Sequence, residues 1–228
     1  MSITYECVLL GTFDSSLLDK VRDKLRVICD ANGDLHCQEK VMSVQAGPNT
    51  TNGRMVMRRE GIDETDESAK WCVCVKWRRV CNSYKPPGLL CVFSELNQRH
   101  SRTFQTNAQK SRYNPQLLIR STINLPLDTN HNAVEFVQAL GYNPNHEFSK
   151  RGDTYMCNGV IVGVYQLHNV GVNGERVHED NVWMVEVRSL PVVPDQSAVA
   201  DPLNVAMHNC LKLKATLKPL VLLKRVEH

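Results

Sequence analysis

The sequence lacks the long apolar runs that a membrane protein needs. No stretch approaches the roughly 18 apolar residues of a membrane-spanning helix, and no apolar signal-peptide core follows Met1. We therefore expect an intracellular, soluble protein without a membrane partner. Hydrophobic residues make up 42% of the chain and charged residues 22%, proportions that are usual for a folded domain and exclude a chain disordered throughout.

The common motifs of catalysis and phosphate binding are also missing. GxSxG, GxxxxGK[ST], GxGxxG and HExxH do not occur, so the sequence gives no nucleophile elbow, phosphate loop or zinc-protease helix. The nine cysteines are an odd number without an export signal, which favours reduced thiols over disulfides. Cys72, Cys74 and Cys81 are not followed by a second ligand pair. We expect no metal site, no cofactor and no catalytic residue.

What the sequence does contain is a series of short strand-like runs. Turn residues separate them, and they alternate apolar and polar side chains or are apolar throughout. Antiparallel pairing in a closed or nearly closed barrel would remove the exposed edges of so many strands. The runs lie at 3–11, 35–45, 53–60, 70–80, 88–96, 116–126, at two or three places within 140–167, at 182–193 and at 220–226.

Three segments have helical periodicity instead. Residues 15–30 form an amphipathic pattern with Asp14 or Ser15 as N-cap, and residues 131–141 end at Gly141, where a left-handed cap is expected. The third helix has Pro202 in its first turn and ends before Pro219. We predict a single mainly β (α+β) domain over 1–228, a barrel of about eight to eleven antiparallel strands flanked or capped by three helices.

The charge of the chain is mildly positive but unevenly distributed. Between Arg54 and Arg120 there are thirteen Lys or Arg residues against six Asp or Glu, an excess of +7 within a total of +3. Such an excess favours an acidic partner or a nucleic acid, although a solvated surface explains it equally well. Residues 97–114 are polar, basic and without periodicity, which predicts a flexible insertion in the domain.

The sequence resembles a known superfamily in four short motifs and a known family in three longer blocks. "LGY", "SKR", "TY" and "WMVEV", in this order, are similar to the central part of the triphosphate-tunnel barrel superfamily. Over nearly the whole chain, the closer resemblance is to the Mediator complex subunit 18 family of head-module proteins. It rests on "YECVLLGTFDSSLLDKVRDKLRVICD", "FVQALGYNPNHEFSKRGDTYMCNGVIVGVYQL" and "LKPLVLLKRV".

The tunnel resemblance raises the question of catalysis. Enzymes of that superfamily hold metal ions with inward carboxylates and the polyphosphate with inward Lys and Arg, beginning at a Glu-x-Glu-x-Lys strand. The corresponding strand here has Glu6 alone, with Val8 and Leu10 at the other two positions. Glu186 is followed two positions later by Arg188 rather than by an acid. The resemblance therefore implies a barrel that has lost its catalysis.

The charged residues on the strands that correspond to the tunnel are expected to have structural and not catalytic roles. We expect Glu6 and Glu186 to be paired with Arg188 or another basic residue, because inward charges in a small barrel must be paired or hydrated. Lys150 and Arg151 are interpreted as remnants or surface charges, and strand alternation allows only one of the two to point inward.

Both faces of the run 160–167 are apolar. We place Ile161, Tyr165 and Leu167 on an outward face that binds a partner, opposite the valines of the same run. The family resemblance implies a noncatalytic structural subunit of Mediator in the nucleus, which bridges regulators and RNA polymerase II. Its implied partners are Mediator subunit 20 as a second barrel, a C-terminal helix of subunit 8 and other head-module subunits.

Two alternatives stay open at this point. One is a metal-dependent triphosphate tunnel phosphohydrolase, against which the missing carboxylates argue. The other is a nucleic-acid-binding barrel that would use the basic segments near Arg58, Arg78 and Lys110. The aromatic residues Trp71 and Trp77 are expected on an apolar strand face and not among these cations, so we expect no sequence-specific binding to nucleic acid.

Overall fold

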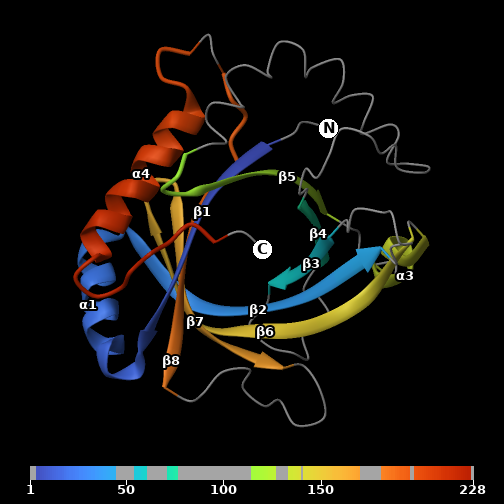
Figure 1. The fold of residues 1–228 in the computed structure, drawn as a ribbon, viewed down its shortest axis with the longest axis horizontal. Helices are drawn as coiled ribbons and strands as arrows, with labels where there is room; N and C mark the ends of the chain where they lie inside the picture. Colours follow the sequence, from blue (N-terminus) through green and yellow to red (C-terminus); the bar gives the residue numbers. More distant parts are fainter. Residues whose placement is uncertain are drawn as a thin grey trace.

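A computed structural model of the chain describes residues 4–44, 54–60, 71–76, 114–126, 133–139, 141–169, 181–195 and 198–226. Figure 1 shows the longer helices along one side of a strongly curved sheet and a short helix at its opposite side. The strands are β1 (Thr4–Asp14), β2 (Ala31–Val44), β3 (Arg54–Glu60), β4 (Trp71–Lys76), β5 (Leu118–Pro126), β6 (Tyr142–Cys157), β7 (Val160–Asn169) and β8 (Val182–Ser189). The helices are a 3-10 turn η1 (Ser15–Leu17), α1 (Leu18–Ile28), α3 (Ala133–Ala139) and α4 (Pro202–Leu217).

Each strand pairs antiparallel with its neighbours in the order β1-β5-β4-β3-β2-β6-β7-β8. The order returns to its start because β1 pairs with β5 over Thr4–Val8 and with β8 over Val8–Asp14, so the pairings form a closed barrel. The longest ladder joins β2 to β6 from Ala31 to Val44 and contains an irregularity after Val41. The expected antiparallel, mainly β fold with a few helices is confirmed.

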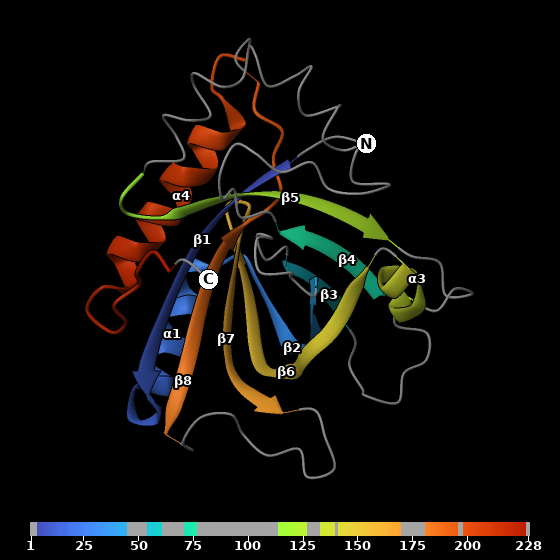
Figure 2. The same cartoon turned by 45° about the vertical axis from the view of Figure 1, so that its right-hand side comes forward.

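The main apolar core lies outside the barrel wall, between the sheet and two helices. Strands β1, β6, β7 and β8 contribute one face, including Leu9, Val162 and Val187, all fully buried. Helix α1 adds its buried Val21 and Leu25, and α4 adds a stripe at intervals of three and four residues. Figure 2 shows α1 and α4 along β1 and β8, with α3 at the far ends of β2 and β6. No helix in the described ranges is long and apolar enough to cross a membrane.

Polar contacts fix α1 on this sheet. The Arg22 guanidinium reaches Asp153 of β6 at 2.8 Å and lies 5.5 Å from the ring centroid of Trp183 on β8. Asp14 accepts a hydrogen bond from the backbone N–H of Ser16, as expected for the cap of this helical segment. At α4 the Asp201 carboxylate accepts from the N–H of Leu203, with Pro202 in the first turn. The predicted Asp14 cap and the predicted Pro202 in the first turn of α4 are confirmed.

The C-terminal segment differs from its prediction. Residues 220–226 were expected to form a strand, but they make a single β-bridge, between Lys224 and Leu10. The segment runs alongside β1 beyond the point where β5 stops, and it buries Val221 and Leu223. A Cβ at Gly11 would lie 2.9 Å from Val221, so glycine permits this close approach. The alternating apolar pattern here reflects one-sided packing on β1, not a full ladder.

Gly141 ends the chain segment after α3 as the sequence predicts. Its φ is +86°, and its N–H donates to the carbonyl of Gln138 at 2.8 Å. No atom lies within 4 Å of the position that a Cβ would take. A side chain at this position is therefore opposed by the backbone conformation alone and not by a steric clash.

We predict that Gly141→Val lowers the free energy of unfolding by about 1 kcal/mol, because a β-branched residue is strained at positive φ. The matched control is Gly33→Ala in β2, where φ is not positive and the nearest atom to a new Cβ is 3.9 Å away. That control is expected to be neutral or slightly stabilising. Urea unfolding followed by circular dichroism measures both, and an unchanged midpoint for Gly141→Val contradicts the assignment.

Candidate functional site on the inner face

The second face of the sheet points into the barrel and carries charged side chains. The register places Arg120 of β5 opposite Glu6 of β1, and Leu10 of β1 opposite Glu186 of β8. Glu6 and Leu10 lie on the same face of β1 because they are separated by four residues. The prediction that Glu6 and Glu186 face the same interior is thus confirmed.

A buried lysine bridges two of the carboxylates. The Nζ of Lys150 on β6 lies 2.8 Å from Glu186 Oε2 and 3.2 Å from Glu39 Oε1 on β2. The three side chains are 9%, 13% and 4% exposed respectively. We call this group the Lys150 cluster. It joins three strands that are far apart in the sequence, and its two carboxylates outnumber the ammonium between them.

Tyr165 of β7 completes the surroundings of the Lys150 cluster. Its hydroxyl donates to Glu186 Oε2 at 3.4 Å, and the Lys150 ammonium lies 4.9 Å from the centre of its ring. Burial, followed by the nearby Glu186 carboxylate, raises the pKa of the Tyr165 phenol well above its usual value. The phenol stays protonated at neutral pH and acts as a hydrogen-bond donor, and its ring receives the ammonium as a cation–π partner.

Glu6 has its own partner on the inner face. Its Oε2 accepts from Arg120 Nη2 at 2.9 Å and from Nε at 3.1 Å, with side chains 5% and 11% exposed. One carboxylate oxygen thus receives two donors of a guanidinium, a strongly favourable geometry for a charged hydrogen bond. The Glu6 charge is compensated by the protein itself.

This arrangement does not suit metal-dependent phosphate chemistry. A divalent ion needs several carboxylate or carbonyl oxygens converging on one point, whereas the Lys150 ammonium stands between Glu39 and Glu186. Among the described residues no group of three His, Cys, Asp or Glu side chains could hold a metal ion. The cavity beside the cluster, which Ile161 and Arg188 also line, measures about 30 Å³, enough for water and far below a usual substrate pocket.

Several sequence-based assignments need correction. Lys150 is not a surface charge but a buried member of the ion-pair network, whereas Arg151 is exposed. The expectation that only one of the two points inward is confirmed. The expectation that Glu186 pairs with Arg188 or another basic residue is met by Lys150 of β6. The sequence could not name Lys150 as that partner, because the pairing crosses between strands.

Glu39 was not among the inward-facing charged residues predicted from the sequence. It lies in a run whose alternate positions Leu35, Cys37 and Val41 are apolar, so an acid on that face was the available signal. Its cross-strand partner is Phe148, two residues before Lys150, so Glu39 and Lys150 lie on the same face of the sheet. A carboxylate that interrupts a buried face requires a cation nearby, and Lys150 is that cation.

The proposed partner residues lie on the other face from the one expected. Ile161, Tyr165 and Leu167 share the inner face with the Lys150 cluster, and Tyr165 is buried. The valines of β7 face outward and are covered by α1 and α4. Alternation separates two faces without indicating which one is inside, and here both are apolar. Partner binding by these three residues stays a prediction, but Tyr165→Asp is now expected to unfold the protein.

Other predicted features are outside the described part of the chain. They include the strand at 88–96, the insertion at 97–114 except Asn114, and the side chains of Cys72, Cys74 and Cys81. The five cysteines that are described are free thiols: Cys7, Cys29, Cys37, Cys157 and Cys210. Burial raises the pKa of the Cys29 thiol to about 12, so this thiol stays protonated at neutral pH.

Comparison with known proteins decides the family. The family model described as Med18 protein matches residues 5–227. The chain belongs to the Med18 family. Members of this family are noncatalytic Mediator subunits, in agreement with the paired inner charges, and the prediction that the chain is not an enzyme is confirmed. The alternative of a triphosphate phosphohydrolase is thereby set aside for the Med18 chain.

Two solved structures are similar to the chain at low sequence identity. A chain in the structure of the Schizosaccharomyces pombe Mediator head module is 20% identical, with a TM-score of 0.62 and coverage of 97% of this chain and 98% of that one. A conserved hypothetical protein from Pyrococcus furiosus is 14% identical, with a TM-score of 0.46 and coverage of 93% and 90%. No curated protein matches the sequence. The similarity to the S. pombe chain supports the fold. The assignment to the Med18 family rests on the family model.

The Lys150 cluster yields a stability prediction. Lys150→Met leaves Glu39 and Glu186 buried without their bridging cation, and we expect a loss of about 3 kcal/mol in the free energy of unfolding. Arg151→Met, one residue away and exposed, is the matched control and is expected to change it by less than about 0.5 kcal/mol. Combining Lys150→Met with Glu39→Gln and Glu186→Gln should restore part of the loss. Equal melting temperatures for Lys150→Met and wild type contradict the assignment.

A second prediction concerns activity. The purified protein is expected to release no phosphate from nucleoside or inorganic triphosphates with Mg²⁺ or Mn²⁺, because its inward carboxylates are already ion-paired with Lys150 and Arg120 and do not converge on one metal position. The assay compares wild type with Glu186→Gln at equal concentration. Turnover that disappears in this variant would overturn the noncatalytic assignment.

Proposed function

We propose that this chain is an assembly subunit of the Mediator head module. The observation that carries the proposal is the family match over residues 5–227, which spans the barrel, both covering helices and the C-terminal segment. In support, the chain shares its fold with a chain in the S. pombe head-module structure. A subunit of a transcription coregulator that acts with RNA polymerase II works in the nucleus, which is the location we propose.

Within the head module we propose Mediator subunit 20 as the immediate partner, a second and related barrel. A C-terminal helix of Mediator subunit 8 is the proposed second ligand, and the resulting assembly would bridge regulators and RNA polymerase II. The resemblance seen in the sequence blocks 5–30, 136–167 and 217–226 underlies these partner assignments. The barrel supplies a rigid frame for such contacts because its inner charges are paired and its outer core is packed by α1 and α4.

The proposal predicts that coexpression of the full chain with Mediator subunit 20 and the C-terminal segment of subunit 8 raises its soluble yield. All three should elute together in size-exclusion chromatography, because subunits of a stable complex bury part of their surfaces against one another. An unrelated helical peptide of the same length in place of the subunit 8 segment is the control. A monodisperse chain that elutes alone in the presence of both partners contradicts the proposal.

A further inference from the structure

Four of the five described cysteines form two pairs, and each pair joins a helix to the barrel wall. Cys29 directly follows α1 and lies beside Cys157 at the end of β6. Cys7 of β1 lies beside Cys210 of α4, whose thiol donates to the Cys7 carbonyl at 3.9 Å. All four are free thiols. The pairs differ in exposure, because Cys7 and Cys210 are both 0% exposed, whereas Cys29 is partly exposed.

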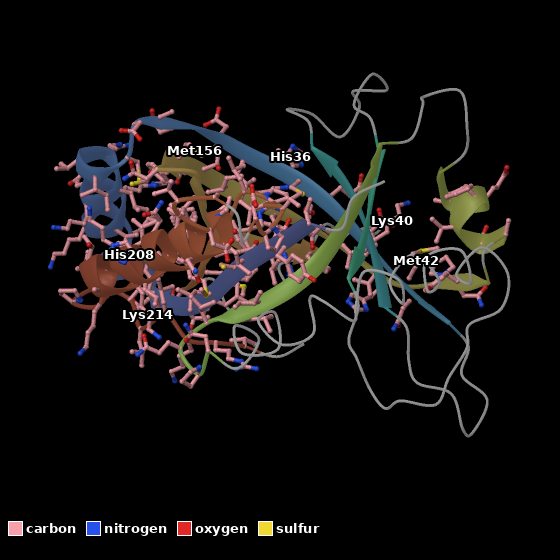
Figure 3. All side chains as sticks on the ribbon, turned by 90° about the horizontal axis from the view of Figure 1, so that it is seen from above. His36, Lys40, Met42, Met156, His208 and Lys214 are labelled. Atoms are coloured by element: carbon pink, nitrogen blue, oxygen red, sulfur yellow. The ribbon has the colours of Figure 1, made fainter. Side chains whose placement is uncertain are left out.

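The backbone brings Cys29 and Cys157 together. The ladder between β2 and β6 begins at Ala31 opposite Met156, and the N–H of Asp30 donates to the Met156 carbonyl at 2.8 Å. Cys29 precedes these residues on one segment and Cys157 follows them on the other, so the two cysteines meet at the end of the ladder. They are 128 residues apart in the sequence. Figure 3 shows Met156 in the half of the molecule that contains α1, away from α3.

The side chains of this pair interact directly. The Cys157 thiol donates to the carbonyl of Ile28 at 3.2 Å, and that carbonyl belongs to the peptide bond that leads into Cys29. Burial, followed by the charge and the hydrogen bond of Cys157, raises the pKa of the Cys29 thiol to about 12. The Asn158 side-chain amide donates to the Cys157 sulfur at 3.5 Å, which stabilises negative charge on that sulfur. Cys157 is therefore the thiolate of the pair, and Cys29 retains its proton.

We propose that Cys29 and Cys157 are an oxidant-sensitive pair that closes to a disulfide when the protein meets a peroxide. The Cys157 thiolate, its proton released to solvent, attacks one oxygen of the peroxide; the O–O bond breaks, the departing oxygen takes a proton, and a sulfenic acid remains. The Cys29 sulfur then attacks the sulfenic sulfur. The S–S bond forms, the S–O bond breaks, and hydroxide leaves with the Cys29 proton as water. The two thiols lose two electrons, which the peroxide gains.

The disulfide joins α1 to a turn that already contacts two other elements. The Asn158 carbonyl accepts from the side-chain amide of Asn209 on α4 at 2.9 Å. The Gly159 carbonyl accepts from the N–H of Leu190, after β8, at 2.9 Å. A covalent link across so long a loop also restricts the unfolded chain. Oxidation therefore locks the junction where both covering helices meet the wall, and this inference does not depend on the assignment to Mediator.

The first test maps the link in the full, reduced chain. Hydrogen peroxide is added in small excess, the remaining thiols are capped with N-ethylmaleimide at intervals, and cross-linked peptides are identified by mass spectrometry. The peptide that joins Cys29 to Cys157 is expected first and should disappear with dithiothreitol. The buried pair of Cys7 and Cys210 is the internal control and should close about tenfold more slowly, because the oxidant cannot reach it. Equal rates for the two pairs, a Cys29–Cys157 link only in urea, or sulfonic acids without a link would overturn the proposal.

Urea unfolding gives a second readout of the same link. Oxidised wild type is expected to unfold at a midpoint about 1 M or more above that of reduced wild type. Cys29→Ser cannot form the link, so its midpoint should be the same before and after peroxide. Cys210→Ala is the matched control, which removes the buried pair and should retain the shift on oxidation. A mapped Cys29–Cys157 link without a shift in wild type, or an equal shift in Cys29→Ser, contradicts the proposed locking.

Discussion

The rest of the structure depends on how the barrel neutralises the charges that it encloses. Closing the sheet takes Glu6, Glu39 and Glu186 out of bulk water, and an ionised carboxylate in such a place is costly unless it is paired. Lys150 and Arg120 provide that pairing across strands. Because each pair joins strands distant in the sequence, the same contacts that neutralise charge also help to specify the register of the wall.

The outer face of the barrel wall is apolar and must be covered by other parts of the chain. Strands β1, β7 and β8 carry apolar side chains outward as well, and a wall one strand thick cannot bury both faces by itself. Helices α1 and α4 cover the outward valines, and the segment after α4 covers β1 where β5 ends. The molecule therefore has ion-paired charges among apolar side chains inside the barrel and its main apolar core outside the wall, under α1 and α4. The enclosed charges of such a barrel therefore contribute to its stability through their pairing.

The sequence predicts where helices and strands lie better than it predicts which face of a strand points into the barrel. Asp14, Pro202 and Gly141 are local signals for helix ends, and the structure places each where the pattern indicated. The orientation of β7 was wrong because its two faces are equally apolar, so Tyr165 could not be assigned to the interior from alternation. Lys150 was misplaced for a related reason: its partners Glu39 and Glu186 lie 111 and 36 residues away along the chain, and only the register brings them together. Local patterns do not encode such pairings.

The central claim is that a Med18-family barrel with a noncatalytic, ion-paired interior works as a subunit of Mediator. Quantitative mass spectrometry of the tagged protein, purified from its own cells under mild salt, tests this most directly. The account predicts Mediator subunits in stoichiometric amounts, with subunits 20 and 8 retained longest as the salt concentration is raised. Recovery of the chain alone, or with a stable set of partners outside Mediator, would contradict it.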